Sequence, residues 1–577
     1  MKVEYLKQGL FMTPQSLLPD NWVLVSALVF WLPGEVIGQK IWKIEMPRYG
    51  NRWPLLLITP VLILIFSFVQ VNSGMLHEAR LLFKLGILCF FGIVTYVFAS
   101  GERLFSRVDR SKATGLEVYS CCLFAYFVSF LSLIWWLPPG VKSIWMWALQ
   151  FEPRLITFIV LVAACGVSIL AISRCLTRLV RLSLATSGCI LWQLGGVLGK
   201  SLSVQEIAES EKISGYLSAS RLFTNTAEIA SSFTERIGTL PFHVNTHPAG
   251  KVFLMHILDS FNQAHTSKIW AIVIILAVSL IVPVSFKISR LMNGSENESI
   301  TAACFVGLIP SLALFSPGFD AYNTFLCALL LLTWIKALRC SSNRKAALWA
   351  IVAGILGYSA VTVSYTSLVF GAVLLCWAPV VLGRHHSTLT YGEMARILIV
   401  LAICAGSALV GIDLLLSSFT GYSNMMSLVR SIEIQSTIEA SNRSGLNAFL
   451  LNIFDYGYGM GPAVLAVAFL LFFRGGQEII KRKLVSDSRQ GHHDKAELSL
   501  TSDSSLVITS ISAVILVGLS GFLDIETARV WLMLMPPSII AVTVWVMKGA
   551  SHRYLGYFFF CQVCWGLVQN LRYQFLF

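Results

Sequence analysis

The residues of this chain best suited to chemistry lie in one polar interval between hydrophobic segments, from about residue 201 to residue 267. At its centre is Asn-Thr-His-Pro-Ala-Gly (245–250), preceded by His243 and by two glutamates, Glu228 and Glu235. Carboxylates and histidines are the common general acids and bases of enzymes. We therefore expect the catalytic or recognition chemistry of this protein to lie in this interval.

Local sequence rules predict the backbone of the central segment. Pro248 favours extended backbone at His247, and Gly250 permits a tight turn into a helix predicted over 252–261. A histidine held at such a turn is well placed to bind an anionic or hydroxylated group. His243 and His247 are four residues apart, but Pro248 argues against one shared helix, so we expect no metal site here.

Four further candidate residues lie later in the chain. Asp320 follows a Ser-Pro-Gly break at the start of a hydrophobic run, where an acid either caps a helix or has a functional role. Tyr322, two residues later, is a candidate substrate-binding residue. Glu526 and Arg529 have i, i+3 spacing. They form either a surface ion pair or a site in which Arg529 binds a phosphate through two hydrogen bonds while Glu526 holds the guanidinium.

The composition places these residues in a membrane protein. The chain has 577 residues, of which 56% are apolar and only 13% charged, with a mean hydropathy of +0.72. This excludes a water-soluble globular protein. Repeated apolar runs of about 18–20 residues are each long enough to cross a hydrocarbon core of roughly 30 Å, which predicts an all-α polytopic bundle. We expect about sixteen transmembrane helices: 21–38, 53–71, 83–100, 116–137, 155–173, 183–199, 268–287, 300–315, 321–337, 346–362, 365–383, 395–413, 449–473, 505–522, 529–547 and 555–571. The helix at 183–199 is the weakest of these, because Gln193, Gly195 and Gly196 interrupt it.

Basic residues in the loops predict the orientation of the chain. The net charge is +13, but 27 of the 43 Lys and Arg fall in one set of alternate loops rather than on one face. This is the distribution that the positive-inside rule produces, so we expect no nucleic-acid partner and assign that set to the cytoplasm. Both termini then face outward, as do four polar clusters: 201–267, 316–320, 414–446 and 523–529.

Several segments have their own expected structure. Apolar spacing predicts amphipathic juxtamembrane helices over 204–217 and 227–237, lying on the bilayer surface. The segment 474–504 is polar and rich in serine, which predicts a flexible cytoplasmic linker. The 13 cysteines fall outside the loops assigned to the exterior, so we expect no structural disulfide.

An ordered set of three segments resembles a known superfamily. The segments are Thr-His-Pro-Ala-Gly at 246–250, Leu-Ile-Pro-Ser-Leu-Ala-Leu-Phe-Ser-Pro-Gly-Phe-Asp at 308–320, and Ile-Glu-Thr-Ala-Arg-Val-Trp at 525–531, followed by Pro536. The chain is similar, over roughly 185–547, to bacterial multi-spanning proteins of the GT-C glycosyltransferase superfamily. That superfamily includes the protein mannosyltransferases and the lipid A aminoarabinose transferases. The resemblance implies a GT-C-like core over 183–577, including the outer loop 200–267, behind an N-terminal extension of about five spans over 1–182.

The resemblance also implies an activity. The expected reaction is transfer of a sugar from a polyprenyl-phosphate donor to a lipid, glycan or protein acceptor at the outer face of a bacterial inner membrane. No cofactor is expected, and no metal ion is supported. The catalytic candidates are Glu228, Glu235 and Asp320. The candidates for substrate binding are His243, His247, Tyr322, Glu526 and Arg529.

Other functions stay open at this point. A transporter would use the intramembrane acids Glu35, Asp413 and Asp455 as an ion relay, although the chain shows no convincing internal repeat. A polysaccharide polymerase or ligase usually carries its large outer loop later in the chain. A catalytically inactive family member is the last alternative. The chain has Ala249 where relatives usually have a second proline, and it lacks their early Asp motif.

Overall fold

The computed structural model describes the chain from Leu155 onward almost throughout, together with Cys121 and residues 147–149. The gaps after Leu155 are 201, 211–214, 387–388, 440–455, 458, 489–501, 521–528, 530, 550–551 and 576–577. Apart from Cys121, the four spans predicted before residue 150 lie outside the described residues. The predicted flexible linker 474–504 is wrong in part, because the chain is helical up to Ser488 and again from Ser502; residues 489–501 lie outside the described residues.

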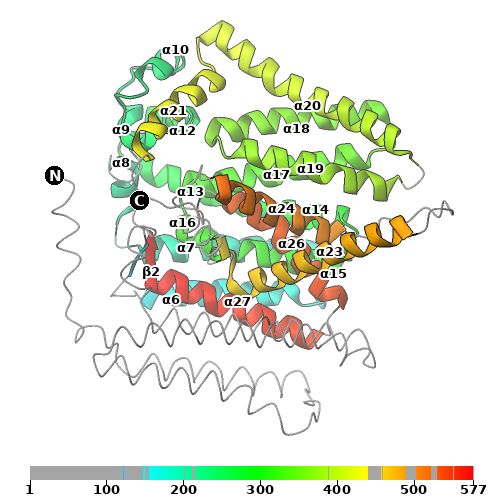
Figure 1. Ribbon diagram of the computed structural model, residues 1–577. Helices are drawn as coiled ribbons and strands as arrows, with labels where there is room; N and C mark the ends of the chain where they lie inside the picture. The colour runs from blue at the N-terminus through cyan, green and yellow to red at the C-terminus, as the bar shows by residue number, and fades with distance from the viewer. Residues whose placement is uncertain are drawn as a thin grey trace, which may run out of the picture. The chain divides into compact units, whose positions relative to one another are not determined.

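The chain divides into two compact units. One comprises Met1–Leu123 and Gly549–Phe560, and the other Phe124–Lys548 and Cys561–Phe577. The architecture and the candidate site described below belong to the second unit, which is almost entirely helical (Figure 1). In the part of this unit that the structure describes, the exception to the all-α prediction is a short antiparallel pair, β1 (Trp147–Leu149) with β2 (Tyr573–Phe575).

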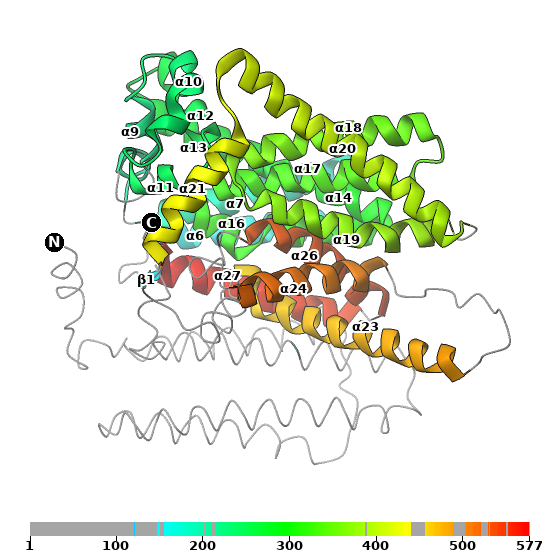
Figure 2. The ribbon, with the colours of Figure 1, turned by 45° about the horizontal axis from the view of Figure 1, so that its top comes forward.

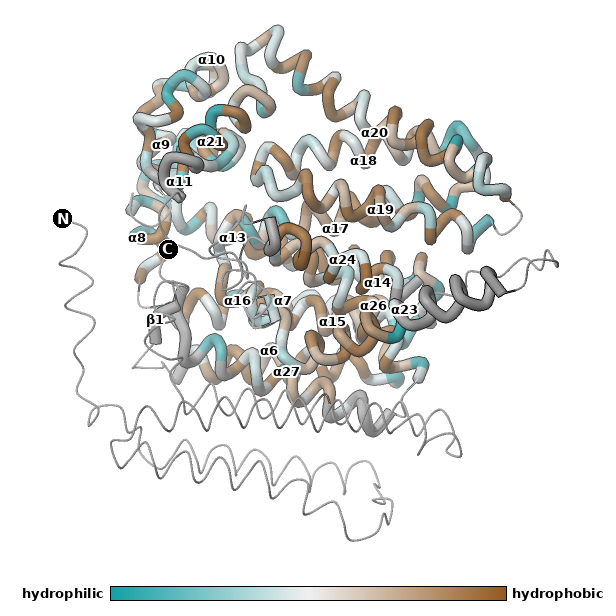
Figure 3. Tube along the Cα trace, in the orientation of Figure 1, coloured by the Kyte–Doolittle hydropathy of each residue, from teal (hydrophilic) through white to brown (hydrophobic). Residues whose placement is uncertain are grey.

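Long apolar helices confirm the membrane-protein character of the sequence. Among the described residues, six helices are long and apolar enough to cross a membrane: α7 (Arg178–Gly199), α13 with α14 (Thr266–Ser279 and Ile281–Leu291), α17 (Phe319–Arg339), α18 (Asn343–Val363), α20 (Tyr391–Thr420), and η3 with α26 (Leu532–Leu534 and Met535–Gly549). Shorter apolar stretches lie in α6 (Leu155–Ile172), α19 (Ser367–His385), α23 (Pro462–Ser488) and α24 (Ser502–Ser520), and the last helix is α27 (His552–Arg572). Hydrophobic residues dominate these helices, while hydrophilic residues gather in the short helix α10 (Thr226–Arg236) (Figure 3). The count of sixteen crossings stays a prediction.

Helix α7 is continuous where the sequence analysis expected an interruption. Gly195 and Gly196 lie inside it, and a Cβ atom at Gly196 would collide with the backbone carbonyl of Ala313. These glycines therefore allow α7 to pack closely against α16 (Pro310–Phe315) rather than breaking it.

The predicted span over 300–315 is not one continuous helix, because the chain forms two helices there. Helix α15 (Glu296–Gly307) ends before Pro310, which is the first residue of α16. Proline is tolerated there because the N–H of the first helical residue has no partner within the helix. The carbonyl of Ile309, left free at this break, accepts a hydrogen bond of 3.0 Å from the Trp192 indole. A buried side chain thus satisfies the interrupted backbone.

Short helices of the polar interval gather at one end of the bundle (Figures 1 and 2). They are α8 (Val204–Glu209), α9 (Tyr216–Ser220), α10, α11 (Phe242–Asn245) and α12 (Gly250–Phe261), and α21 (Asn424–Glu439) lies beside them. The helix predicted over 204–217 is therefore in two parts. Gly215 separates them in a left-handed conformation with φ of 64°, which glycine adopts without strain.

The apolar face of α10 is covered by protein, not laid on a bilayer as predicted. Ile229, Phe233 and Ile237 are all buried. Asn225 caps the N-terminus of this helix by accepting a hydrogen bond from the Glu228 amide. The helix predicted over 227–237 is confirmed to within one residue. The prediction that its apolar side lies on a bilayer is wrong.

Candidate functional site

The first turn of α17 carries an acid paired with a distant arginine. The Asp320 carboxylate lies 3.3 Å from Nε of Arg529, and only 15% and 8% of the two side chains are exposed. Gly318, not Asp320, occupies the N-cap position, so the acid is free of the capping role that the sequence allowed. At this low exposure the two charges attract each other more strongly than in a surface ion pair, and removing either one would leave the other uncompensated.

A buried lysine lies beside this pair. Lys251, in the first turn of α12, is 1% exposed and donates a hydrogen bond of 3.1 Å from Nζ to the Tyr216 hydroxyl. Its ammonium also lies 4.9 Å from the centre of the Tyr216 ring and 6.0 Å from that of Phe319. Lys251 was not among the candidate residues predicted from the sequence. The available signal was a lysine at a helix N-terminus, where the helix dipole disfavours a positive charge.

The two histidines of the polar interval face these charges. Nδ1 of His247 lies 2.7 Å from the backbone carbonyl of His243, which can only accept, so Nδ1 carries the proton and Nε2 is left as an acceptor. Burial lowers the pKa of His247 well below its ordinary value, and the charges of Lys251 and Arg529 lower it further. The imidazole is therefore neutral at physiological pH and offers one proton-accepting nitrogen.

The pKa of His243 is also depressed, to about 4. Burial is the largest cause, and Arg529 and Lys251 add to it. Asp320 opposes them with its negative charge. These mutual effects place His243, His247, Lys251, Asp320 and Arg529 in one electrostatic cluster, which we call the charged cluster. With both histidines neutral, its formal charge is positive, which suits an anionic ligand.

Contacts from α18 and from the turn between α20 and α21 hold the His-Pro turn. Gly250 has no Cβ because one would collide with the Thr362 carbonyl of α18, so glycine serves close packing there. The backbone N–H of Ala249 donates a hydrogen bond of 3.1 Å to the hydroxyl of Tyr422. The alanine therefore supplies a hydrogen-bond donor that holds the turn. The proline expected from the resemblance would lack this N–H.

The segment leading into Asp320 is fixed from α7. Nζ of Lys200 donates a hydrogen bond of 2.7 Å to the Ser316 carbonyl, and the Ser316 hydroxyl donates one of 2.9 Å to Gln193. Burial lowers the pKa of Lys200 to about 7. Gln193, read in the sequence as a helix interruption, thus helps to position the segment before the acid.

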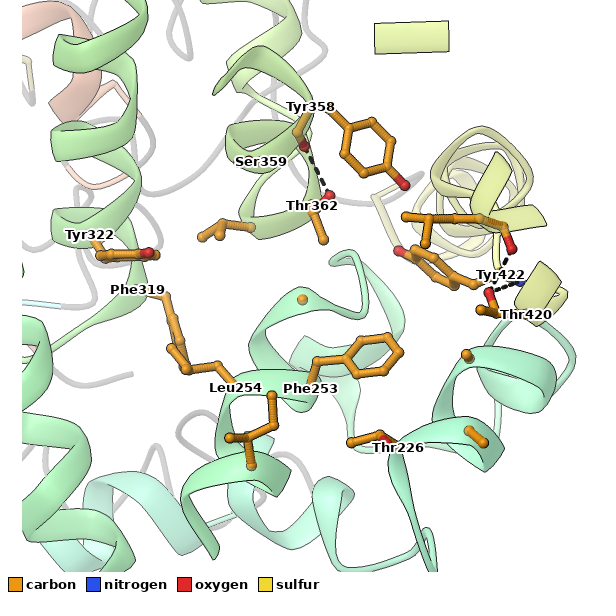
Figure 4. A pocket seen from close by; sticks show the side chains of 16 residues that line it. Thr226, Phe253, Leu254, Phe319, Tyr322, Tyr358, Ser359, Thr362, Thr420 and Tyr422 are labelled. Carbon is orange, nitrogen blue, oxygen red and sulfur yellow. Dashed lines mark hydrogen bonds between the residues drawn. The ribbon is translucent and has the colours of Figure 1, made fainter. Parts of the chain in front are cut away.

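A cavity of about 660 Å³ opens beside the charged cluster, between α10, α12, α17, α18 and α20. Its lining is largely apolar and aromatic (Figure 4): Phe253, Leu254, Ile257, Phe319, Tyr322, Leu416 and Tyr422 are among the residues that form it. Phe319 lines the cavity and also faces the Lys251 ammonium. The predicted substrate residue Tyr322 therefore contributes to the apolar cavity.

The two predicted glutamates are placed differently from Asp320. The Glu228 carboxylate accepts hydrogen bonds from the Thr224 amide and hydroxyl and from Arg236, and the Thr224 bonds lower its pKa. Glu235 is exposed. Glu526 lies outside the described residues, so its predicted pairing with Arg529 stays a prediction; Arg529 lies against the Asp320 carboxylate.

The intramembrane acid Asp413 has a structural role in the described residues. It accepts hydrogen bonds from the Tyr358 hydroxyl, the Ser423 hydroxyl and the Asn424 amide. These bonds fix the junction between α20 and α21. The other two acids of the transporter hypothesis, Glu35 and Asp455, lie outside the described residues.

The depressed pKa of His243 predicts an acid-dependent loss of stability. In the unfolded chain this histidine takes up a proton near pH 6.5, but in the folded protein only near pH 4. The unfolded state therefore binds more protons between these values, and the free energy of unfolding falls as the pH drops through this window, by up to about 3 kcal/mol. Above pH 6.5 the contribution is constant.

Thermal unfolding at a series of pH values tests this. His243→Gln should show a shallower decline between pH 6.5 and pH 4 than the unaltered protein. His265→Gln, at an exposed histidine of the same interval, is the matched control and should keep the original slope. Equal slopes in both variants would contradict the burial of an uncharged His243.

Among the described residues no group of three or more His, Cys, Asp or Glu is placed to hold a metal ion. Comparisons of the chain with protein-family models, with curated proteins and with solved structures found no match.

Proposed function

We propose that this protein is a membrane glycosyltransferase that transfers a sugar from a polyprenyl-phosphate donor to a lipid, glycan or protein acceptor. One observation carries the proposal: the charged cluster, with its acid Asp320, adjoins a largely apolar cavity at one end of a bundle of membrane-length helices. A lipid-linked sugar phosphate has a long apolar chain, an anionic group and a reactive sugar, in that order. The site offers complementary chemistry to each.

The cationic residues would bind the donor phosphate. Arg529 has several N–H donors, enough to hold a phosphate while still contacting Asp320, and Lys251 adds a second positive charge. Nε2 of His247 is a neutral acceptor for a sugar hydroxyl. As negative charge develops on the departing phosphate, fixed cations at this low exposure stabilise it.

Asp320 would act as the general base. In the proposed step the acceptor hydroxyl oxygen attacks the anomeric carbon, the bond from that carbon to the phosphate oxygen breaks, and the hydroxyl proton passes to the Asp320 carboxylate. The products are the glycosylated acceptor and polyprenyl phosphate. Asp320 is favoured over the two glutamates. The Glu228 carboxylate already accepts hydrogen bonds from Thr224 and Arg236, and Glu235 is exposed.

The outward orientation rests on the loop charges and on the donor. Nucleotide sugars are cytosolic, so a site at the outer face requires a lipid-linked donor. All four clusters assigned to the outside make contacts through described residues: the Thr234–Ser427 hydrogen bond of 2.8 Å joins 201–267 to 414–446, the rings of Tyr216 and Phe319 join 201–267 to 316–320, and the Asp320–Arg529 pair joins 316–320 to 523–529. A common location for these clusters supports a single site.

Replacement of Lys251 tests the proposal directly. Lys251→Met keeps the length and packing of the side chain but removes the charge, so the protein should stay folded and bind donor less tightly. A charge-assisted contact of this kind corresponds to a loss of roughly tenfold or more in affinity. The measurement is binding of a panel of polyprenyl-phosphate sugars to the purified protein, with release of polyprenyl phosphate as the activity readout.

Lys345→Met provides the matched control, because Lys345 is an exposed lysine near the start of α18. It should leave both donor binding and release unchanged. Binding of no member of the panel to the unaltered protein would reject the proposed donor class. Equal affinity of the unaltered and Lys251→Met proteins would reject the role of the lysine.

A further inference from the structure

Helix α21 has its polar and apolar faces reversed relative to a water-facing helix. Among its described side chains, 424–434, those that are fully buried are polar: Asn424, Ser427 and Ser431. Ser427 hydrogen-bonds to Thr234 of α10 through their hydroxyls. A helix on the surface of a protein in water would bury apolar side chains instead.

Three exposed apolar side chains of α21 form one stripe, and a fourth, Met426, is exposed on the flank of the helix beside it. Met425, Val429 and Ile432 recur at i, i+4 and i+7, the spacing of one helix face, and all three are exposed. Arg430 and Glu433 form an exposed ion pair of 2.8 Å on the neighbouring part of the helix surface. An exposed apolar stripe next to a charged one is the pattern of a helix lying at a membrane–water interface.

The preceding helix shows where that interface lies. The exposed apolar side chains of α20 run from Ile399 to Phe419, and little of this helix is covered by protein. Twenty residues of α-helix rise by about 30 Å, which is the thickness of a hydrocarbon core. Phe419 therefore marks one boundary of the hydrocarbon. The chain then turns at Gly421, whose φ is 82°, and α21 starts three residues later.

We propose that α21 docks on the lipid bilayer surface at the boundary marked by Phe419, through the stripe formed by Met425, Val429 and Ile432. The stripe follows the exposed apolar side chains of α20 in the chain, immediately after the Gly421 turn. The Arg430–Glu433 pair then faces water or lipid headgroups, where exposed charges cost little. Because Tyr422, in the same turn, receives the Ala249 hydrogen bond, docking of α21 also anchors the turn that carries His247.

Photo-crosslinking in lipid nanodiscs tests the docking. A diazirine-bearing amino acid is placed at position 429 or, as the matched control, at position 433, the exposed glutamate of the Arg430–Glu433 pair on the same helix. After irradiation, mass spectrometry measures lipid adducts, water adducts and protein cross-links. We expect roughly tenfold more lipid adduct at 429 than at 433, in proportion to the preference of an apolar side chain for an apolar environment.

Three results would overturn this inference. They are equal lipid adducts at both positions, mainly water adducts at position 429, and cross-links from 429 to another segment of the chain or to a second copy. None of these measurements depends on sugar transfer, so the docking of α21 and the proposed activity succeed or fail separately.

Discussion

Asp320→Asn is expected to reduce sugar transfer by about 10²–10⁴-fold, the usual contribution of a general base. The amide keeps the size of the side chain and its place in the first turn of α17, but it cannot accept the proton of the acceptor hydroxyl. Donor affinity should change much less than the transfer rate, because the phosphate is held by the cations. Single-turnover transfer with pre-bound donor separates the two quantities.

Loss of the Asp320 charge also leaves Arg529 without its carboxylate, so a second variant is needed to separate chemistry from folding. Asp320→Glu keeps the charge and moves it by one methylene group, which should preserve stability but still reduce transfer. Glu235→Gln, at an exposed acid of the polar interval, should transfer sugar at the native rate. If both Asp320 variants worked at that rate, the assignment of the base would be wrong.

Arg529→Lys should already weaken donor binding, although it conserves the charge. A lysine replaces the planar fork of donors with one ammonium group, so it cannot hold a phosphate and the Asp320 carboxylate at once. Donor affinity should fall by roughly tenfold or more, in line with loss of a charged hydrogen bond. Equilibrium binding of labelled polyprenyl-phosphate sugars to the purified variant is the measurement.

Arg529→Ala should have a larger effect, because it leaves the little-exposed Asp320 carboxylate without a counter-charge. Breaking a buried ion pair typically costs about 3–5 kcal/mol of stability, so thermal unfolding should also shift downward. The control is Arg430→Lys, in an ion pair whose two side chains are more than half exposed. Native donor affinity in Arg529→Lys, with the fold intact, would leave Arg529 a purely structural role.

The sequence determined the class of the protein because that property depends on composition and local order. Long apolar runs must become helices in a bilayer, where each backbone polar group needs an internal partner. The helices over 227–237 and 252–261 followed from spacing and turn residues alone, and the structure places them within two residues. Candidate residues such as His247 and Asp320 stood out because polar side chains are costly, and therefore rare, in so apolar a chain.

Only the tertiary structure decided which candidates meet. Asp320 and Arg529 lie far apart in the chain, and nothing in the sequence distinguishes Asp320 from Glu228 as the partner of an arginine. Short-range hydrogen bonds from Thr224 and a salt bridge from Arg236 engage Glu228, whereas close packing of distant helices brings Asp320 to the charged cluster.

The partners of whole helix faces were likewise set by packing. Spacing showed that α10 has an apolar side, but a bilayer and a protein core satisfy that side equally well, so the sequence could not choose between them. Lys251 was missed for the same reason, since its burial depends on Tyr216 and Phe319 from two other helices. Local patterns determine what a segment can form, whereas the environment of each side chain depends on contacts between segments that sequence order does not encode.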